Sequence, residues 1–384
     1  MIIRPFWLDK IRQVWETRSI AWLSGVRRVG KTTLAKMFEG AVYLNCDLPS
    51  VERRLKDPES YFDSLGNDSI VIFDEVHQMK DPSRLLKIVA DAYPNLKVLA
   101  TGCSTLAASK KFRDTLTGRK HEIYLPPVIW NECQEDFAIN DLDKRLLHGG
   151  LPESLLSDRK DVSFFSEWID SFYARDIQEL FGIRNRVGFI KLFHLLMRSS
   201  GGMVDYVSLA KLSELSYPTV LAHVEAMTIA HACFLLPPFH GGGRREIVAR
   251  PKIYGFDTGF VTYCKGWETI REDDRGLLWE HLVLDNLRSR IHSNYLFYWR
   301  DKSNREIDFI INNKKQMIHT IECKINPDHY KPEALQVFRD IYPTGENFVI
   351  CPHMKTPYKQ KRNNLTITFC STDDSTIADL VKTL

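Results

Sequence analysis

The sequence predicts an α/β fold in three consecutive parts, and three stretches of the 384-residue chain carry this prediction. The first is a glycine-rich segment between an apolar strand and a helix, at 24–33. The second is an apolar strand that ends in two acidic residues, at 69–75. The third is a pair of strands, at 306–311 and 317–325, with acidic residues and a lysine on one face. They predict a parallel sheet in residues 1–140, a helical region in 141–250 and a second α/β domain in 251–384.

The composition excludes several classes of protein. Hydrophobic residues make up 44% of the chain, which is enough for real cores, and the net charge of +3 is too even to indicate nucleic-acid binding by itself. The 8 cysteines show no C-x-x-C spacing, which predicts reduced thiols in a cytoplasmic protein without structural zinc. The N-terminus is charged and amphipathic, and no apolar run approaches the ~18 residues of a membrane helix. We therefore expect a cytoplasmic location and no membrane contact.

The segment SGVRRVGKTT, at 24–33, matches the phosphate-binding pattern G-x-x-x-x-G-K-[ST] between a predicted strand at 20–23 and a predicted helix at 33–38. Backbone N–H groups of such a loop turn towards phosphates, and the helix N-terminus faces the anion. Lys31 would place its charge at the β- and γ-phosphates, and Thr32 would offer a hydroxyl to Mg²⁺. The motif predicts ATP and Mg²⁺ as cofactors. The predicted nucleotide-binding residues are Gly25, Val26, Arg27, Arg28, Val29, Gly30, Lys31, Thr32 and Thr33.

Polar side chains follow two further predicted strands, after a weaker strand at 41–45. The strand at 69–75 ends in Asp74 and Glu75, and active groups of parallel sheets lie at the carboxyl ends of strands. Asp74 would hold Mg²⁺, mostly through water, and Glu75 would orient or deprotonate the attacking water. Thr101 follows the strand at 96–100 and is favoured over Ser104 as a contact to the γ-phosphate or the water; simple turn chemistry is the alternative.

Two arginines after this strand, Arg113 and Arg119, are placed to reach the nucleotide of a neighbouring subunit. An arginine supplied in this way stabilises the charge that spreads over a transferring phosphoryl group. Local pairing with Asp114 or Glu122 is the alternative for either side chain, and from the residues alone it is the favoured one.

The middle region predicts helices at 142–147 and 164–181, the second with an aromatic core face. Two short helices, at 207–215 and 218–230, meet at Ser216, a suitable N-cap, and a glycine-rich hairpin tip follows at 241–245. This order predicts a winged helix. Its recognition helix, 217–229, contains no lysine or arginine, although readers of the major groove need such donors. A packing role is therefore favoured over sequence reading, and backbone contacts through the wing would come from Arg244, Arg245 and Arg250.

The C-terminal part predicts a helix at 277–291 with Glu280 on its apolar stripe, then strands at 295–299, 306–311 and 317–325. Asp308 points away from its apolar neighbours, and Glu322 shares a face with Lys324 because the two lie two residues apart. This is the layout of a PD-(D/E)xK nuclease core. Asp308 and Glu322 would bind Mg²⁺, Lys324 would orient the water or stabilise the phosphorane charge, and Glu280 would assist a metal-bound water. A local basic run either is solvated or holds phosphates: Lys355, Lys359, Lys361 and Arg362.

The motif order resembles an AAA-type P-loop ATPase, and the whole chain is similar to bacterial and archaeal ATPases that carry a C-terminal domain of unknown function with a restriction-endonuclease-like fold. The matching pieces are GVRRVGKTT (25–33), IFDE (72–75), ATGCS (100–104), LTGR (116–119), GGLPES (149–154), YARDI (173–177), KIYGFDTG (252–259), EIDFII (306–311) and IECK (321–324). The resemblance implies nucleotide-dependent assembly of a homo-oligomer through the ATPase domain, with Arg119 as the arginine finger. It implies no substrate.

Two functions remain open at this point. In the first, the ATPase drives or gates a metal-dependent nuclease that acts on DNA or RNA. In the second, the protein is a nucleotide-switched assembly protein whose nuclease-like domain is inactive and only binds a partner. The joint presence of Asp308, Glu322 and Lys324 favours the first, and the near-neutral charge with the unbasic recognition helix favours the second.

Overall fold

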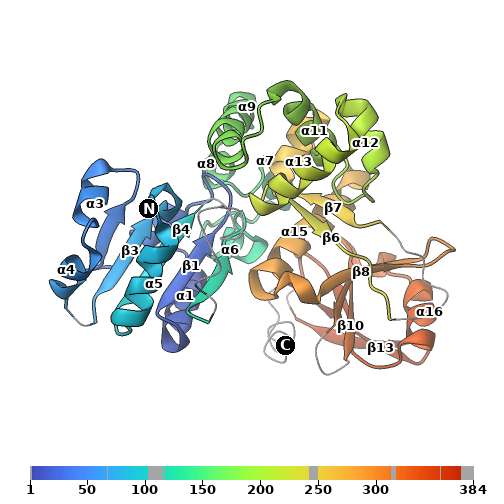
Figure 1. Cartoon of the computed structure of the whole chain (residues 1–384). Coiled ribbons are helices and arrows are strands. Elements are labelled where there is room, and N and C mark those ends of the chain that lie inside the picture. The colour runs from blue at the N-terminus through green and yellow to red at the C-terminus, as the bar shows by residue number, and fades with distance from the viewer. Residues whose placement is uncertain are drawn as a thin grey trace.

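The computed structural model describes residues 2–66, 68–102, 116, 118–241, 250–312, 317–354 and 356–372. Three parts follow one another along the chain: a parallel sheet flanked by helices, a group of helices, and a second sheet (Figure 1). Within these described ranges, no helix is long and apolar enough to cross a membrane.

The N-terminal sheet is parallel throughout and has the order β2-β3-β4-β1-β5. This confirms the predicted parallel sheet of P-loop type. Since neighbouring strands run the same way, their carboxyl ends meet at one edge, with Ser24 opposite Gly102 and Asn45 opposite Asp74. The elements are α1 (Pro5–Thr17), β1 (Ile20–Ser24), α2 (Lys31–Ala35), β2 (Val42–Asn45), α3 (Pro49–Arg54), α4 (Pro58–Asp63), β3 (Ile70–Asp74), the 3-10 turn η1 (Val76–Gln78), α5 (Pro82–Ala92), β4 (Lys97–Gly102) and β5 (Lys120–Tyr124).

Both faces of this sheet are covered, which explains why its central strands are apolar without alternation. Every residue of β1 is buried. Ala21 and Leu23 pack into one cluster with Trp7 of α1, whereas Ile20 and Trp22 pack into a second cluster on the opposite face.

The middle region is mainly helical. Ser216 caps α13 as predicted, since its Oγ accepts a hydrogen bond from the backbone N–H of Thr219 at 3.3 Å. The helix predicted at 164–181 is divided by a π-helical segment, a feature that often marks functional sites. The elements are α6 (Trp130–Glu135), α7 (Leu142–His148), α8 (Pro152–Leu156), α9 (Val162–Ser171), the π-helix η3 (Phe172–Gln178), α10 (Glu179–Phe181), α11 (Arg186–Arg198), α12 (Tyr206–Ser213), α13 (Tyr217–Ile229), β6 (Cys233–Leu236), β7 (Lys252–Gly255) and α14 (Thr258–Lys265).

Two elements that the sequence assigned to the third part are joined to the second. Strand β7 pairs antiparallel with β6, with Lys252 opposite Leu236, and α14 packs against α7 and α11. The hydrogen-bonded pair β6–β7 therefore spans the boundary predicted at 250/251. Arg244 and Arg245, which the sequence predicts at a hairpin tip, lie outside the described residues.

The C-terminal sheet is mixed and has the order β12-β13-β11-β10-β9-β8. The three strands predicted near 295–325 are present as β8, β9 and β10, and the helix before them begins five residues earlier than expected, at Glu272 instead of Leu277. Helix α15 contacts β5, α7 and β10, so it joins all three parts of the chain (Figure 1). The elements are α15 (Glu272–Arg290), η4 (Ser293–Tyr295), β8 (Leu296–Arg300), β9 (Glu306–Asn312), β10 (Ile318–Cys323), η5 (Pro327–His329), α16 (Glu333–Ile341), β11 (Asn347–Ile350), β12 (Tyr358–Arg362) and β13 (Leu365–Cys370).

Candidate functional site

The glycine-rich loop connects β1 to α2 and needs its glycines for two different reasons. A Cβ at Gly25 would lie 2.5 Å from the carbonyl oxygen of Leu125, and Gly30 has a φ of 105°, which side chains rarely adopt. Lys31 begins α2 and is buried. Its Nζ donates to the carbonyl oxygens of Gly25 at 2.8 Å and Val26 at 3.0 Å. The ammonium group thus lies within the curve of the loop, where phosphates are bound in P-loop proteins.

A buried ion pair next to the loop connects the start of the N-terminal helix to the rest of the domain. Arg4 Nε lies 2.7 Å from Glu132 Oε1, and the side chains are 5% and 2% exposed. The same carboxylate accepts from Trp7 Nε1 at 2.8 Å, while Arg4 Nη1 donates to the carbonyl oxygen of Val29 in the loop at 3.2 Å. The pair therefore contacts the loop through the carbonyl group of Val29.

Glu132→Ala should lower the free energy of unfolding by about 3–5 kcal/mol, because it leaves the Arg4 charge buried without a counter-charge. Denaturant unfolding followed by tryptophan fluorescence measures this loss. The exposed pair of Arg12 with Asp9 on the same helix provides the control, and Asp9→Ala should cost less than about 1 kcal/mol. Equal losses in the two variants would show that the buried pair contributes no more to the free energy of unfolding than the exposed pair.

Asp74 lies at the end of β3, and its carboxylate accepts hydrogen bonds from three hydroxyl groups that belong to three different elements. Its carboxylate accepts from Thr32 Oγ1 at 2.8 Å, Thr101 Oγ1 at 2.6 Å and the Tyr43 hydroxyl at 2.5 Å. Burial, followed by the hydrogen bond to Asp74, raises the pKa of Tyr43 well above its usual range. A threonine hydroxyl beside a carboxylate is the oxygen donor set with which P-loop proteins hold Mg²⁺, so these residues fit that ion. Nothing in the sequence pattern pointed to Tyr43.

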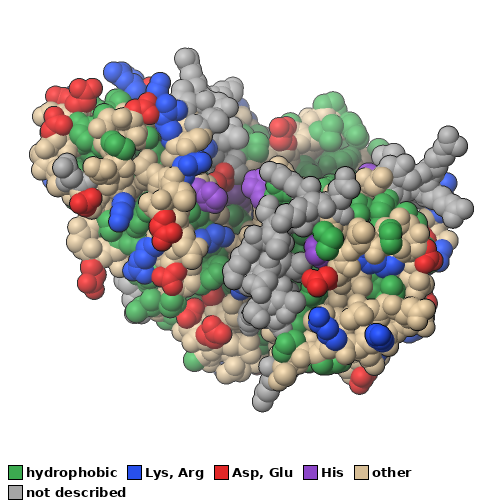
Figure 2. All heavy atoms as spheres, turned by 90° about the horizontal axis from the view of Figure 1, so that it is seen from below, with side chains coloured by type: hydrophobic (Ala, Val, Ile, Leu, Met, Phe, Trp, Pro, Cys, Tyr) green, Lys and Arg blue, Asp and Glu red, His purple; other side chains and the backbone are tan. Residues whose placement is uncertain are grey.

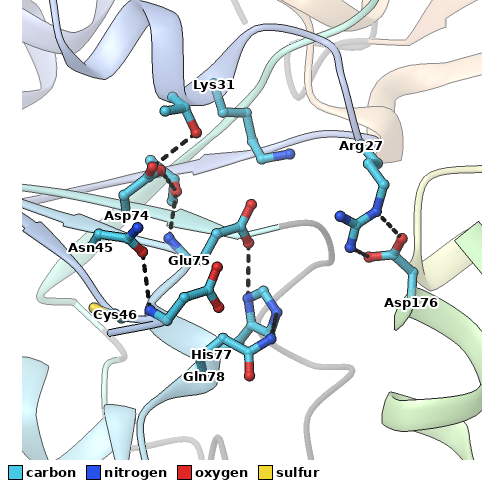
Figure 3. A network of polar contacts seen from close by, with 12 residues as sticks. Arg27, Lys31, Asn45, Cys46, Asp74, Glu75, His77, Gln78 and Asp176 are labelled. Carbon is cyan, nitrogen blue, oxygen red and sulfur yellow. Dashed lines mark hydrogen bonds and ion pairs between the residues drawn. The ribbon is translucent and has the colours of Figure 1, made fainter. Parts of the chain in front are cut away.

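Glu75 directly follows Asp74 and has a φ of 55°, a left-handed conformation that is uncommon for a residue with a side chain. Strained residues of this kind concentrate at functional sites. The backbone N–H of Glu75 donates to Thr101 Oγ1 at 3.0 Å, and its carboxylate lies 3.3 Å from His77 Nδ1 (Figure 3). Thr101 is fully buried and contacts both acidic residues, so its hydroxyl positions the pair. Ser104 and Arg113 lie outside the described residues.

The middle region also contacts the loop, which the sequence did not predict. Arg27 forms a bidentate ion pair with Asp176 of the π-helix, at 2.9 and 3.3 Å (Figure 3). The carbonyl oxygen of Arg27 accepts from Trp168 Nε1 at 3.0 Å, and the Arg28 guanidinium lies 5.6 Å from the Phe164 ring centre. The loop is thereby connected to α9 and η3 as well as to its own sheet.

Arg119 is distant from the loop of its own chain. It directly precedes β5, whose first residue pairs with Ile20 at the start of β1, so it lies at the sheet edge opposite the loop. Its guanidinium binds Asp91 of α5, with Nε–Oδ1 at 2.5 Å and Nη2–Oδ2 at 3.2 Å, and about a third of the side chain is exposed. The predicted local partner Glu122 is not the one in these contacts. Asp114 lies outside the described residues.

In the C-terminal domain, β9 and β10 bring three predicted residues together. Lys324 Nζ lies 2.8 Å from Glu322 Oε2 and 3.8 Å from Asp308 Oδ2. Asp308 Oδ2 also accepts from the backbone N–H of Cys323 at 2.7 Å. Burial, and next the negative charge of Asp308, raises the pKa of Glu322 to about 8. The two carboxylates therefore lie on one side of the sheet and share one lysine.

Glu280 reaches the same site from α15. Burial, and next the charge of Asp308, raises its pKa to about 7. It is held by Lys252 Nζ at 3.1 Å and by the hydroxyl of Tyr254, both from β7. Across the described ranges, no group of three or more His, Cys, Asp or Glu side chains is arranged to hold a metal ion. Asp308 and Glu322, the predicted Mg²⁺ ligands, thus share Lys324, and Glu280 contacts Lys252. As arranged, these carboxylates do not fit a metal centre.

Basic side chains give little support for a nucleic-acid surface. Lys359 and Lys361 are exposed on β12, whereas Arg362 donates to the carbonyl oxygen of Tyr330 at 2.7 Å and Lys355 is outside the described residues. Arg250 lies 3.2 Å from Asp205. On the face in Figure 2, basic and acidic side chains are interspersed among the described residues.

Three known protein families match successive segments of the chain, in the order of its three parts. Residues 17–134 match the AAA domain family AAA_14, residues 139–271 match the domain of unknown function DUF8612, and residues 275–370 match the domain of unknown function DUF4143. Uncharacterized proteins of Mycobacterium bovis and Mycobacterium tuberculosis are each 24% identical over 313 residues, which is 79% of this chain and 69% of theirs.

Two solved structures are similar to this chain at low identity. A Walker-type ATPase of Pyrococcus abyssi is 15% identical, with a TM-score of 0.42 over 69% of this chain and 96% of that chain. A single-substitution variant of RuvB from Thermotoga maritima is 16% identical, with a TM-score of 0.32 over 62% of this chain and 90% of that chain. The family match and the loop, sheet and acidic residues agree, and they show that this chain carries a P-loop ATPase domain of the AAA type.

Proposed function

We propose that the N-terminal domain hydrolyses ATP with Mg²⁺ and that Glu75 activates the attacking water. The observation that carries this proposal is the hydroxyl-to-carboxylate chain Thr32–Asp74–Thr101, whose last hydroxyl also accepts from the backbone of Glu75. Lys31 would bind the β- and γ-phosphates, while Thr32 and Asp74 would hold Mg²⁺, which neutralises phosphate charge. The remaining backbone N–H groups of residues 25–33 would cradle the phosphates.

Glu75→Gln should retain ATP binding and lose at least about 100-fold in turnover, because an amide cannot accept the proton of the attacking water. Phosphate release measures turnover, and fluorescence of a labelled nucleotide measures binding. Glu59→Gln, at an exposed position on α4, is the matched control and should hydrolyse ATP as the unchanged protein does. Unchanged turnover in Glu75→Gln would refute the role of Glu75 while leaving ATP binding intact.

A second candidate function is metal-dependent cleavage of nucleic acid by the C-terminal domain. The specific observation in its favour is that Lys324 contacts both Asp308 and Glu322, so the residues predicted from β9 and β10 share one site. The lysine contacts of the carboxylates do not form an open metal position, and no cleavage step follows from the arrangement as it stands. An inactive domain that binds a partner during nucleotide-switched assembly is the competing function.

Asp308→Ala should end any Mg²⁺- or Mn²⁺-dependent cleavage of plasmid or single-stranded DNA and RNA, yet leave ATP hydrolysis unchanged, since the two sites share no residue. Gel electrophoresis of the nucleic acid and phosphate release are measured on the same preparation. Asp301→Ala, which removes a carboxylate from the turn before β9, is the control. Cleavage that survives in Asp308→Ala comes from a contaminant, and absence of cleavage in the unchanged protein under every nucleotide condition favours the partner-binding function.

A further inference from the structure

The carboxylate site of the C-terminal domain contains a cation that belongs to another part of the chain. Lys252 lies on β7, which pairs with β6 of the middle region. Its ammonium group contacts Glu280 Oε1 at 3.1 Å and Glu306 Oε1 at 2.5 Å, and its side chain is 4% exposed. The neighbouring Tyr254, on the same strand, donates its hydroxyl to the same oxygen of Glu280.

The carboxylates around Lys252 matter because a buried charge must be compensated by groups of opposite charge. An ammonium group removed from water is costly unless carboxylates and hydrogen bonds replace the lost hydration. Glu280 and Glu306 satisfy Lys252 from two elements, α15 and β9, and Arg300 Nη1 lies 3.3 Å from the second oxygen of Glu306. Strand β7 therefore contacts the site through two of its side chains, those of Lys252 and Tyr254.

The two lysines divide the carboxylates into two sets. Lys324 engages Asp308 and Glu322, whereas Lys252 engages Glu280 and Glu306. Four carboxylates from α15, β9 and β10 therefore face two ammonium groups and, at Glu306, the Arg300 guanidinium. A divalent cation between the two sets would face both ammonium groups at short range, and like charges at such distances repel strongly in a partly buried site.

We infer that Lys252 is a built-in counter-ion that holds the C-terminal carboxylate site closed to divalent metal. This inference rests on the proposed second function, because it concerns the same carboxylates.

The test compares Mn²⁺ binding to the unchanged protein and to Lys252→Met, by calorimetry and by the electron paramagnetic resonance signal of unbound Mn²⁺. Lys252→Met keeps most of the side-chain volume and removes the charge, so Mn²⁺ affinity should rise at least about tenfold. Lys252→Arg keeps the charge and should bind as weakly as the unchanged protein. Lys191→Met removes a lysine from an exposed pair with Glu214 and should change nothing. To separate this site from the ATPase site, all proteins also carry Asp74→Asn.

The possible outcomes distinguish a failure of this inference from a failure of the proposed second function. Equal Mn²⁺ affinity in Lys252→Met and the unchanged protein overturns the counter-ion inference but leaves a metal site in place. No Mn²⁺ binding in either protein overturns both. Should Lys252→Met fail to fold, Lys252→Gln, which removes the charge with a polar side chain, is measured in its place, and the same tenfold rise is expected. Asp308→Ala in the tighter-binding variant should abolish the gain; a gain that persists would place the metal elsewhere and overturn the inference.

Discussion

Lys31→Ala is expected to abolish ATP binding, with a loss of affinity of about 100-fold or more, that is about 3 kcal/mol. The ammonium group lies inside the loop and is held there by the carbonyl oxygens of Gly25 and Val26. When phosphates enter, it exchanges these neutral acceptors for charged ones, and charge-assisted hydrogen bonds are roughly twice as strong as neutral ones. Calorimetry or fluorescence of a labelled nucleotide, in the presence of Mg²⁺, measures the loss.

The control for this prediction lies at the end of the same helix. Lys36 follows α2 at its C-terminal end and is exposed, so Lys36→Ala should bind ATP normally. Because Lys31→Ala also leaves two loop carbonyls without their donor, thermal unfolding of the nucleotide-free protein is measured in parallel. A variant that unfolds as the unchanged protein does and still binds ATP with similar affinity would contradict the assignment of this loop as the phosphate-binding site.

The strand and loop elements were predictable because their signals are local. Four or five consecutive apolar residues predicted β1 and β3, and the two glycines with Lys31 fixed the loop between β1 and α2. In the same way, alternation predicted that Asp308 lies opposite its apolar neighbours and that Glu322 shares a face with Lys324. That Asp308 lies on the same side as this pair comes from the structure.

The contacts between distant parts of the chain could not be predicted in this way. Arg27 meets Asp176 across 149 positions, and Lys252 meets Glu306 from a hairpin whose strands the sequence assigned to different domains. No local pattern encodes such pairs, since each depends on how separate elements pack. The same limit explains the boundary predicted at 250/251, because the pairing of β7 with β6, which lies before this boundary, depends on how the two strands pack and is not encoded locally.

The position of Arg119 bears on how neighbouring subunits cooperate in ATP hydrolysis. Arg119 lies at the edge of the sheet opposite the loop, so it does not serve the nucleotide of its own chain in this structure. An arginine finger provided by a neighbouring subunit needs such an outward position, partial exposure and a long side chain. Its pairing with Asp91, which is itself 43% exposed, would hold the guanidinium in place until a neighbouring subunit docks.

Arg119→Ala should therefore reduce turnover by about 10³-fold and leave ATP affinity nearly unchanged, because an arginine finger acts mainly on the transition state. Arg18→Ala is the matched control, since Arg18 is exposed at the same edge just before β1 and should have no effect. Asp91→Asn should keep full turnover, because it removes only the resting partner. Mixing Arg119→Ala with Glu75→Gln subunits should restore part of the activity, as some interfaces then combine an intact Glu75 with an intact Arg119. If both variants assemble and the mixture stays inactive, Arg119 acts within its own subunit or only supports α5 through Asp91.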